Sequence, residues 1–225
     1  MSNNKFKVIL VGESGVGKTC IIKQYIENSF DSEEIPTIAG QEVFKEIQIG
    51  KETVKLTVWD TCGQEQFRSI NSIFMKKSNI VIFVYDITDQ KSFNELKNYW
   101  CDEVKNSLGE DVVFAVAGNK SDLYEDQIIS SEEGKEFANS INAYFKETTA
   151  TDNEVITELF YNVAEICLKK KLGNNIIDDN SNSNNNGNNS SNTSDNFSLK
   201  NNNNDNNNNN DNNNDDSNKK KRRWC

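Results

Sequence analysis

The sequence predicts an α/β domain built on a mainly parallel sheet. Two nearly continuous apolar runs, Ile80–Tyr85 and Val112–Ala117, are typical of parallel strands that are covered on both faces. Helical patterns alternate with such strands along the chain, and a glycine-rich run, Gly12–Gly17, follows the first strand. Because helices that join parallel strands cross over in a right-handed sense, this alternation favours a sheet with helices on both faces.

The first part of the chain is expected to supply a strand, a helix and a hairpin. Lys5–Val11 predicts a buried strand, and Lys18–Asn28 has the pattern of a helix. Glu42–Ile49 and Glu52–Trp59 predict the two strands of a hairpin about Gly50-Lys51. In the second of these strands apolar and polar residues alternate, which is the period of a strand covered on one face.

The later part of the chain is expected to supply three helices and a further short strand. Ser92 and Glu95 match a capping box at the start of one helix, Ser92–Leu108, whose apolar residues form a single stripe. Ser130 and Glu133 match a second capping box. The remaining expected elements are a helix that ends at Ile141, a short strand at Ala143–Glu147 and a final helix at Glu154–Lys171.

The composition divides the 225 residues into a body and a tail. In residues 174–218, 24 of the 45 positions are Asn, and such a segment cannot bury enough apolar surface to offset the entropy of ordering it. We therefore expect a folded domain at residues 1–173, a disordered Asn-rich linker at 174–218 and a basic C-terminal segment at 219–225.

Charge and composition exclude several functions. The formal net charge is −10, and an acidic body argues against a nucleic-acid partner. The chain has no histidine, which excludes Ser-His-Asp triads and histidine-ligated metals. Its 5 cysteines are widely spaced and contain no C-x-x-C pair, so neither a disulfide framework nor a zinc site is expected. No apolar run is long enough to span a membrane, and no signal peptide begins the sequence.

The glycine-rich run carries the strongest functional signal. Gly12-Glu13-Ser14-Gly15-Val16-Gly17-Lys18-Thr19 matches G-x-x-x-x-G-K-[ST], with a strand before it and a helix after it. In that pattern backbone N–H groups wrap the phosphates of a nucleotide. Lys18 would reach the β- and γ-phosphates, and the Thr19 hydroxyl would bind Mg²⁺. The alternative is a glycine-rich turn without a ligand, which the complete match in the expected context disfavours.

Two further segments lie where predicted strands end. Asp60-Thr61-Cys62-Gly63-Gln64 places a carboxylate for Mg²⁺ at Asp60, a γ-phosphate contact at Gly63 and a water-orienting side chain at Gln64. Asn119-Lys120-Ser121-Asp122 follows the strand Val112–Ala117. There the Asp122 carboxylate can accept two N–H bonds from a guanine edge, which adenine cannot donate, and ligands bind at the carboxyl ends of such strands.

These motifs resemble the small Ras-like GTPases and, among them, the Rab family, over about residues 5–171. The segments that resemble Rab sequences are Lys55–Thr61, Phe67–Ile70, Val84–Thr88 and Gly118–Leu123. The resemblance implies a P-loop GTPase domain with a six-stranded sheet and one antiparallel strand. It also implies binding of GTP and GDP with Mg²⁺ and slow hydrolysis of GTP.

The resemblance assigns roles to further residues. It places Thr37 at the contact with Mg²⁺ and the γ-phosphate, Phe30 beside the guanine ring, and Thr149-Ala150 where a backbone N–H meets the guanine oxygen. Gln64 is the expected catalytic residue, and Thr19, Thr37 and Asp60 are the expected metal ligands. The full expected nucleotide-binding set is Gly12, Glu13, Ser14, Gly15, Val16, Gly17, Lys18, Thr19, Cys20, Phe30, Thr37, Asp60, Gly63, Asn119, Lys120, Asp122, Thr149 and Ala150.

Three departures from the Rab pattern concern partners and the base rather than the phosphates. Ile38-Ala39-Gly40-Gln41-Glu42 stands where Rab proteins typically have Ile-Gly-Val-Asp-Phe, so Glu42 replaces an aromatic residue of the first switch. Cys62 replaces an alanine, which is a small change. Thr151 replaces a lysine near the base, so one flank of the guanine pocket differs.

The expected function is a GTP-hydrolysing switch that directs membrane traffic. Its partners would be an exchange factor, a GTPase-activating protein and effectors. A Ras-like signalling GTPase is the runner-up, and a nucleotide-bound interaction module with negligible turnover is the non-enzymatic alternative. A nuclear-transport GTPase is disfavoured by Cys225.

The end of the sequence is expected to anchor the protein to a membrane. Five bases, Lys219–Arg223, precede Trp224 and Cys225, and a prenyl group on Cys225 would act together with the bases on anionic lipids. The expected location is the cytoplasmic side of a membrane, with a soluble cytosolic pool. A solvated basic tail and a nuclear localisation signal are the alternatives.

Overall fold

We describe the protein from a computed structural model, which covers residues 4–31, 41–61, 74–109 and 111–182 of the 225, with side chains up to Gly173. The strands form one six-stranded sheet in the order β2-β3-β1-β4-β5-β6. β2 runs antiparallel to β3, and every other neighbouring pair is parallel. This confirms the predicted fold class. The strands are β1 Asn4–Val11, β2 Gln41–Ile49, β3 Glu52–Asp60, β4 Ile80–Asp86, β5 Val113–Asn119 and β6 Tyr144–Glu147.

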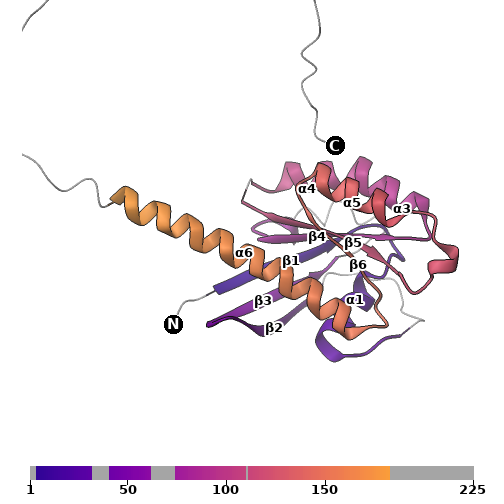
Figure 1. The fold of residues 1–225 in the computed structure, drawn as a ribbon, viewed down its shortest axis with the longest axis horizontal. Coiled ribbons are helices and arrows are strands. Elements are labelled where there is room, and N and C mark those ends of the chain that lie inside the picture. Colours follow the sequence, from indigo (N-terminus) through magenta and orange to yellow (C-terminus); the bar gives the residue numbers. More distant parts are fainter. Residues whose placement is uncertain (1–3, 32–40, 62–73, 110, 183–225) are drawn as a thin grey trace, which may run out of the picture.

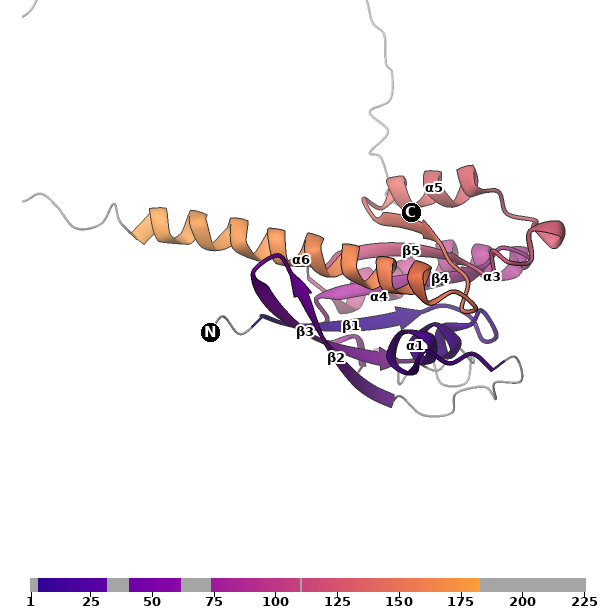
Figure 2. The same ribbon diagram turned by 60° about the horizontal axis from the view of Figure 1, so that its bottom comes forward.

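Helices cover both faces of the sheet. Figure 1 shows α1 and α6 on one face and α3, α4 and α5 on the other, and the turned view in Figure 2 agrees. The helices are α1 Lys18–Glu27, α3 Gln90–Glu95, α4 Cys101–Ser107, α5 Ser131–Ser140 and α6 Asn153–Asn182. A π-helical turn, Leu96–Trp100, joins α3 to α4, and a 3₁₀ turn, Tyr124–Asp126, precedes α5.

The hydrophobic core is split into two layers by the sheet. Because successive side chains of a strand point to opposite faces, Val8 and Leu10 of β1 join the cluster beneath α1 and α6. Ile9 and Val11 join the cluster beneath α3, α4 and α5. All four side chains are fully buried, which is why β1 is apolar along its whole second half.

The helix expected at Ser92–Leu108 differs in two respects. It starts at Gln90, because the Asp89 carboxylate accepts a hydrogen bond from the Lys91 N–H and caps it. The predicted capping box of Ser92 with Glu95 is therefore wrong. Ser92 is instead fully buried, where its hydroxyl accepts from the Asp86 N–H at 3.1 Å. The single predicted helix is also interrupted by the π-helical turn.

The second predicted capping box is confirmed. Ser130 accepts a hydrogen bond from the Glu133 N–H at 3.2 Å, and the Glu133 carboxylate accepts from the Ser130 N–H at 3.0 Å. These two bonds satisfy donors at the start of α5 that have no partner inside the helix. The Glu133 carboxylate accepts hydrogen bonds from the Ser130 N–H and from the Ser130 hydroxyl, and these two bonds lower the pKa of the Glu133 carboxyl below its ordinary value, since both favour the charged form.

α6 is longer than expected. It was predicted to end at Lys171 but continues to Asn182, so residues 174–182 of the expected disordered linker are helical. Extending an existing helix adds a hydrogen bond per residue without a new nucleation cost, and this carries α6 past Gly173. The rest of the expected linker and the basic segment 219–225 lie outside the described residues. Within the described ranges, no helix combines the length and the apolarity of a membrane span.

Candidate nucleotide-binding site

The loop between β1 and α1 has a backbone that only glycine fits at its two ends. Gly12 has φ 149°, and a Cβ there would lie 2.2 Å from the Val84 carbonyl oxygen on β4. Gly17 has φ 95°, and a Cβ there would lie 2.4 Å from the Asn119 side-chain nitrogen on β5. The loop is thus packed against the ends of two neighbouring strands, as a phosphate-binding loop requires.

The start of α1 is suited to an anion. Gly17 is its N-cap and has no side chain to bond the first N–H groups, and the first turn carries no acidic residue. Lys18 is 5% exposed and donates through Nζ to the carbonyl oxygens of Gly12 at 2.9 Å and Glu13 at 2.7 Å. The loop therefore curls around the Lys18 ammonium group, and the positive N-terminal end of α1 begins at the same loop.

A hydroxyl and a carboxylate meet beside this loop. Thr19, in the first turn of α1, donates from Oγ1 to Oδ2 of Asp60 at 2.8 Å. Asp60 ends β3 and is 4% exposed. Hard oxygen ligands of this kind suit Mg²⁺, and the Thr–Asp pair fits that ion. In the part of the chain that the structure describes, no three acidic or cysteine side chains gather into a metal cluster.

Asn119 joins three segments of the site. Its Nδ2 donates to the Val16 carbonyl oxygen in the loop at 2.8 Å, and its Oδ1 accepts from the Thr148 hydroxyl at 3.1 Å. Asn119 is 1% exposed and ends β5. Both ends of its amide are therefore engaged with protein, so Asn119 fixes the phosphate loop against the segment that follows β6.

Lys120 is held by an aspartate of the neighbouring strand. It has φ 65°, and its Nζ lies 2.6 Å from Oδ2 of Asp86 at the end of β4. The other oxygen of Asp86 accepts from the Thr88 N–H at 2.9 Å and the Thr88 hydroxyl at 2.8 Å. Asp86 and Thr148 are site residues that the sequence reasoning missed. Their position at or just after strand ends is the signal that could have found them.

The third segment places a carboxylate next to two hydroxyls. Asp122 is exposed, and its Oδ1 accepts from the Thr149 hydroxyl at 2.5 Å. Thr149 Oγ1 lies 2.8 Å from Thr151 Oγ1 and accepts from the Thr151 N–H at 3.2 Å. Ala150, between the two threonines, is buried. The predicted base-reading residues thus come together from segments that are 27 residues apart.

The other expected site residues divide into those near the loop and those outside the described ranges. Glu13 and Val16 are buried, whereas Ser14 is exposed. The Cys20 thiol donates to the Asp31 carbonyl oxygen at 3.8 Å, and Phe30 is 49% exposed. Thr37, Gly63, Gln64 and Cys225, together with the departures at 38–40 and Cys62, lie outside the described residues.

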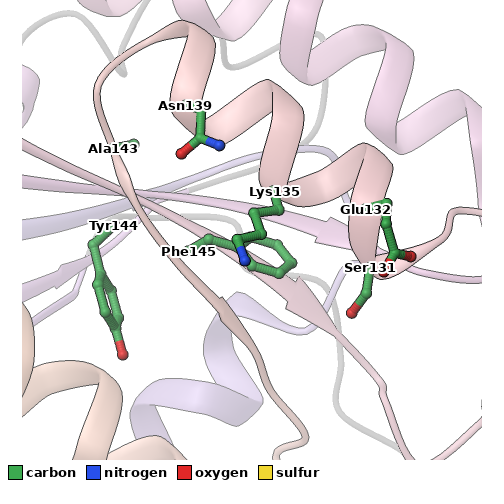
Figure 3. Close-up of a pocket in the computed structure, with 7 residues that line it drawn as sticks. All are labelled: Ser131, Glu132, Lys135, Asn139, Ala143, Tyr144 and Phe145. Carbon is green, nitrogen blue, oxygen red and sulfur yellow. The ribbon is translucent and has the colours of Figure 1, made fainter.

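A cavity of about 470 Å³ lies elsewhere, between α5 and β6. Figure 3 shows Ser131, Lys135 and Asn139 of α5 along one side and Tyr144 and Phe145 of β6 along the other. It shares no residue with the phosphate loop or with the segments 119–122 and 149–151. The candidate site is therefore distinct from this cavity.

A glycine loop between a strand and a helix, aligned with the carboxyl ends of the neighbouring strands, defines a P-loop nucleotide-binding protein. Comparison with known proteins gives the family. Residues 7–169 match the model of the Ras family, and the chain belongs to that family. Among similar curated proteins, human Ras-related protein Rab-21 is 39% identical over 160 residues, which are 71% of each chain. The GTP-binding protein ypt1 of Schizosaccharomyces pombe is 37% identical over 170 residues, 76% of this chain and 83% of that protein. The protein is a Rab-type member of the Ras-like small GTPases. Proteins of this class hydrolyse GTP, and the Rab members regulate membrane traffic.

Proposed function

We propose that this protein switches between GTP- and GDP-bound states at the site described above and that it thereby controls a step of membrane traffic. The observation that supports this most strongly is the convergence of Lys18, the Thr19–Asp60 pair and the Asp122–Thr149 pair at the carboxyl edge of one sheet. The first two features suit a polyphosphate with a metal, and the third suits a guanine.

Each part of the nucleotide has a matching group in this proposal. The loop N–H groups and Lys18 hold the phosphates, while Thr19 and Asp60 would hold Mg²⁺, which supplies charge neutralisation at the phosphates when bound. Thr37 is the further metal ligand that the family pattern assigns. Asp122 reads the guanine edge, because its carboxylate accepts both the ring N–H and the amino group.

Base selectivity is tested by competition binding. GTP should compete for the protein far more strongly than ATP in the presence of Mg²⁺, and Asp122→Ala should remove most of that difference. Two charge-assisted hydrogen bonds are worth several kcal/mol, which corresponds to orders of magnitude in affinity. Equal affinities of the wild type for GTP and ATP would overturn the assignment.

Hydrolysis is proposed to depend on Gln64, which orients the attacking water. An unaided rate on the order of 10⁻⁴ s⁻¹ is typical of this class, and an activating protein that supplies an arginine raises it by about 10³–10⁵. A non-enzymatic alternative, a nucleotide-bound interaction module, predicts no measurable turnover. A Ras-like signalling role is the alternative within the enzyme class.

Single-turnover hydrolysis of bound GTP separates the enzymatic proposal from the non-enzymatic one. The wild type should hydrolyse GTP slowly, and Gln64→Leu should be slower still. Gln48→Leu is a matched control, because Gln48 is exposed on β2 near the hairpin and its side-chain amide donates to the Thr53 hydroxyl at 2.8 Å. Turnover by Gln64→Leu at the wild-type rate, or none by the wild type, would contradict the assigned role.

Membrane attachment is proposed to use Cys225 and the bases Lys219–Arg223 together. A single prenyl or acyl chain anchors only marginally, whereas each basic residue adds up to about 1 kcal/mol at an anionic surface. The residues between the domain and this segment would act as a tether.

The exchange factor, activating protein and effectors are expected from the family, and Glu42 in place of an aromatic residue indicates that the effectors differ from those of typical Rab proteins.

A further inference from the structure

The side chain of Trp100 bonds a residue of the phosphate loop. Trp100 is fully buried, and its Nε1 donates a hydrogen bond of 3.1 Å to Oε1 of Glu13, which is 8% exposed. The two residues are 87 positions apart in the chain. Glu13 is the second residue of the loop that wraps the phosphates, so this bond connects the nucleotide site to the helical layer of α3 and α4.

The charge of Glu13 makes this bond important. A buried carboxylate is costly unless it accepts hydrogen bonds, and a phosphate-binding loop is an unfavourable place for a negative side chain that faces the ligand. The indole N–H draws the Glu13 carboxylate toward Trp100. The backbone carbonyl of the same residue accepts from Lys18 Nζ at 2.7 Å. Glu13 therefore links Trp100 to the lysine that the site uses for phosphate.

The geometry of the helix places Trp100 at this position. Trp100 is the last residue of the π-helical turn Leu96–Trp100, whose closing bond runs from the Cys101 N–H to the Leu96 carbonyl oxygen. A π-helical turn contains one extra residue, which rotates the following part of the helix by about 100° relative to an unbroken α-helix. Such turns occur frequently at functional sites.

We infer that Trp100 is a positioning residue for the phosphate loop: through Glu13 it holds the loop and Lys18 in the nucleotide-binding geometry and slows nucleotide release. This inference rests on the proposed binding of guanine nucleotides. It assigns a role in nucleotide exchange to a fully buried residue of α3–α4, outside every motif of the site.

The test measures the release rate of fluorescently labelled GDP from the full chain with Mg²⁺. Trp100→Phe keeps an aromatic ring but removes the N–H, so the buried carboxylate loses a donor and release should accelerate on the order of tenfold. In a Glu13→Gln background, where no carboxylate remains, the same substitution should change release by less than about threefold. Equal effects in both backgrounds would overturn the inference.

A core variant distinguishes positioning from general destabilisation. Val104→Ala removes two methyl groups from a fully buried side chain of the same cluster and keeps both partners of the Trp100–Glu13 bond. Urea unfolding should show that Val104→Ala and Trp100→Phe lower the free energy of unfolding by similar amounts. At that matched stability, Val104→Ala should release GDP at close to the wild-type rate. If Val104→Ala accelerates release as much as Trp100→Phe, Trp100 only fills the core and the inference fails.

A fluorescence measurement keeps the inference testable if Trp100→Phe does not fold. In a chain with Trp59→Phe and Trp224→Phe, the emission of Trp100 should change when GDP is removed with EDTA, since the loop bonded to its indole then rearranges. Unchanged emission would contradict the inference. If the wild type binds no guanine nucleotide, the proposed function itself fails, whereas binding without these effects refutes only the role of Trp100.

Discussion

The hydroxyl of Thr149 bonds Asp122 and uses all of its hydrogen-bonding capacity. It donates to Asp122 Oδ1 at 2.5 Å and accepts from the Thr151 N–H at 3.2 Å. Thr151 Oγ1 lies 2.8 Å away and must be the donor, because the single Thr149 proton is already used. One donated and two accepted bonds use the full capacity of a hydroxyl, so Thr151 orients the Thr149 hydroxyl, which in turn orients the Asp122 carboxylate. Thr151 is the residue that stands where Rab proteins typically have lysine.

Thr149→Val should therefore weaken guanine-nucleotide binding. The substitution keeps the size of the side chain but removes the hydroxyl that orients Asp122, and a net hydrogen bond is worth about 0.5–1.5 kcal/mol, or roughly two- to tenfold in affinity. Titration with labelled GDP measures the change. Thr157→Val on α6, which loses a hydroxyl bond to the Asn153 side chain, is the matched control and should bind as the wild type does. Affinity unchanged in Thr149→Val would refute the orienting role.

Gly134 of α5 is expected to tolerate no side chain. A Cβ there would lie 2.3 Å from the Tyr85 hydroxyl oxygen and 2.7 Å from a ring carbon of Phe145. Gly134→Ala should lower the free energy of unfolding by about 1–3 kcal/mol through overpacking, despite the better helix propensity of alanine. Urea denaturation measures this. Gly109→Ala, where nothing lies within 4 Å, should be close to neutral, and Tyr85→Phe should partly rescue Gly134→Ala.

Two buried tyrosines predict a loss of stability at alkaline pH. Burial raises the pKa of Tyr25 and of Tyr85 well above the ordinary value of 10.0, and for Tyr85 the nearby carboxylates Glu147 and Glu133 raise it further. Below pH 10 both rings are neutral in the folded and unfolded chains, so their contribution is complete. Above pH 10 the unfolded chain releases these protons first, and stability falls by up to about 1.4 kcal/mol per pH unit per tyrosine.

Urea denaturation between pH 9 and pH 11 checks this dependence. Tyr25→Phe should reduce the fall in stability with rising pH, and Tyr85→Phe should do the same. Tyr124→Phe is the matched control, since the Tyr124 side chain is 70% exposed, and its curve should follow that of the wild type. Parallel curves for all three variants would show that other groups cause the alkaline loss.

The proposed two-part anchor predicts a graded loss of membrane binding. Cys225→Ser should move the protein into the soluble fraction, because the basic run by itself is a weak anchor. Neutralising Lys219–Arg223 should weaken or redistribute membrane binding and leave GDP affinity unchanged. Cell fractionation, with intact-mass measurement of the wild type, reads out both. The proposal would be contradicted if Cys225→Ser stayed on membranes and the intact mass of the wild type showed no lipid. The basic run Lys219–Arg223 would then be a nuclear localisation signal or a solvated tail.

The sequence determined the phosphate loop and the fold class because their signals are local. Eight contiguous residues, Gly12–Thr19, carry the chemistry of the loop, and the apolar period of each strand reports its own burial. The prediction failed where two nearby residues compete for the same role, because the local pattern does not show which of them is buried. Ser92 matched a cap but is buried against Asp86, and Asp89 caps the helix instead.

Only the tertiary structure decided how the segments of the site are joined. Asn119 bonds Val16 across 103 residues, and Trp100 bonds Glu13 across 87. Neither pair leaves a periodic or contiguous pattern in the sequence, because the pairing of β4 with β5 and the π-helical turn before α4 bring these side chains to their partners. The residue types of the site are therefore written in the sequence, while their orientation is a consequence of packing.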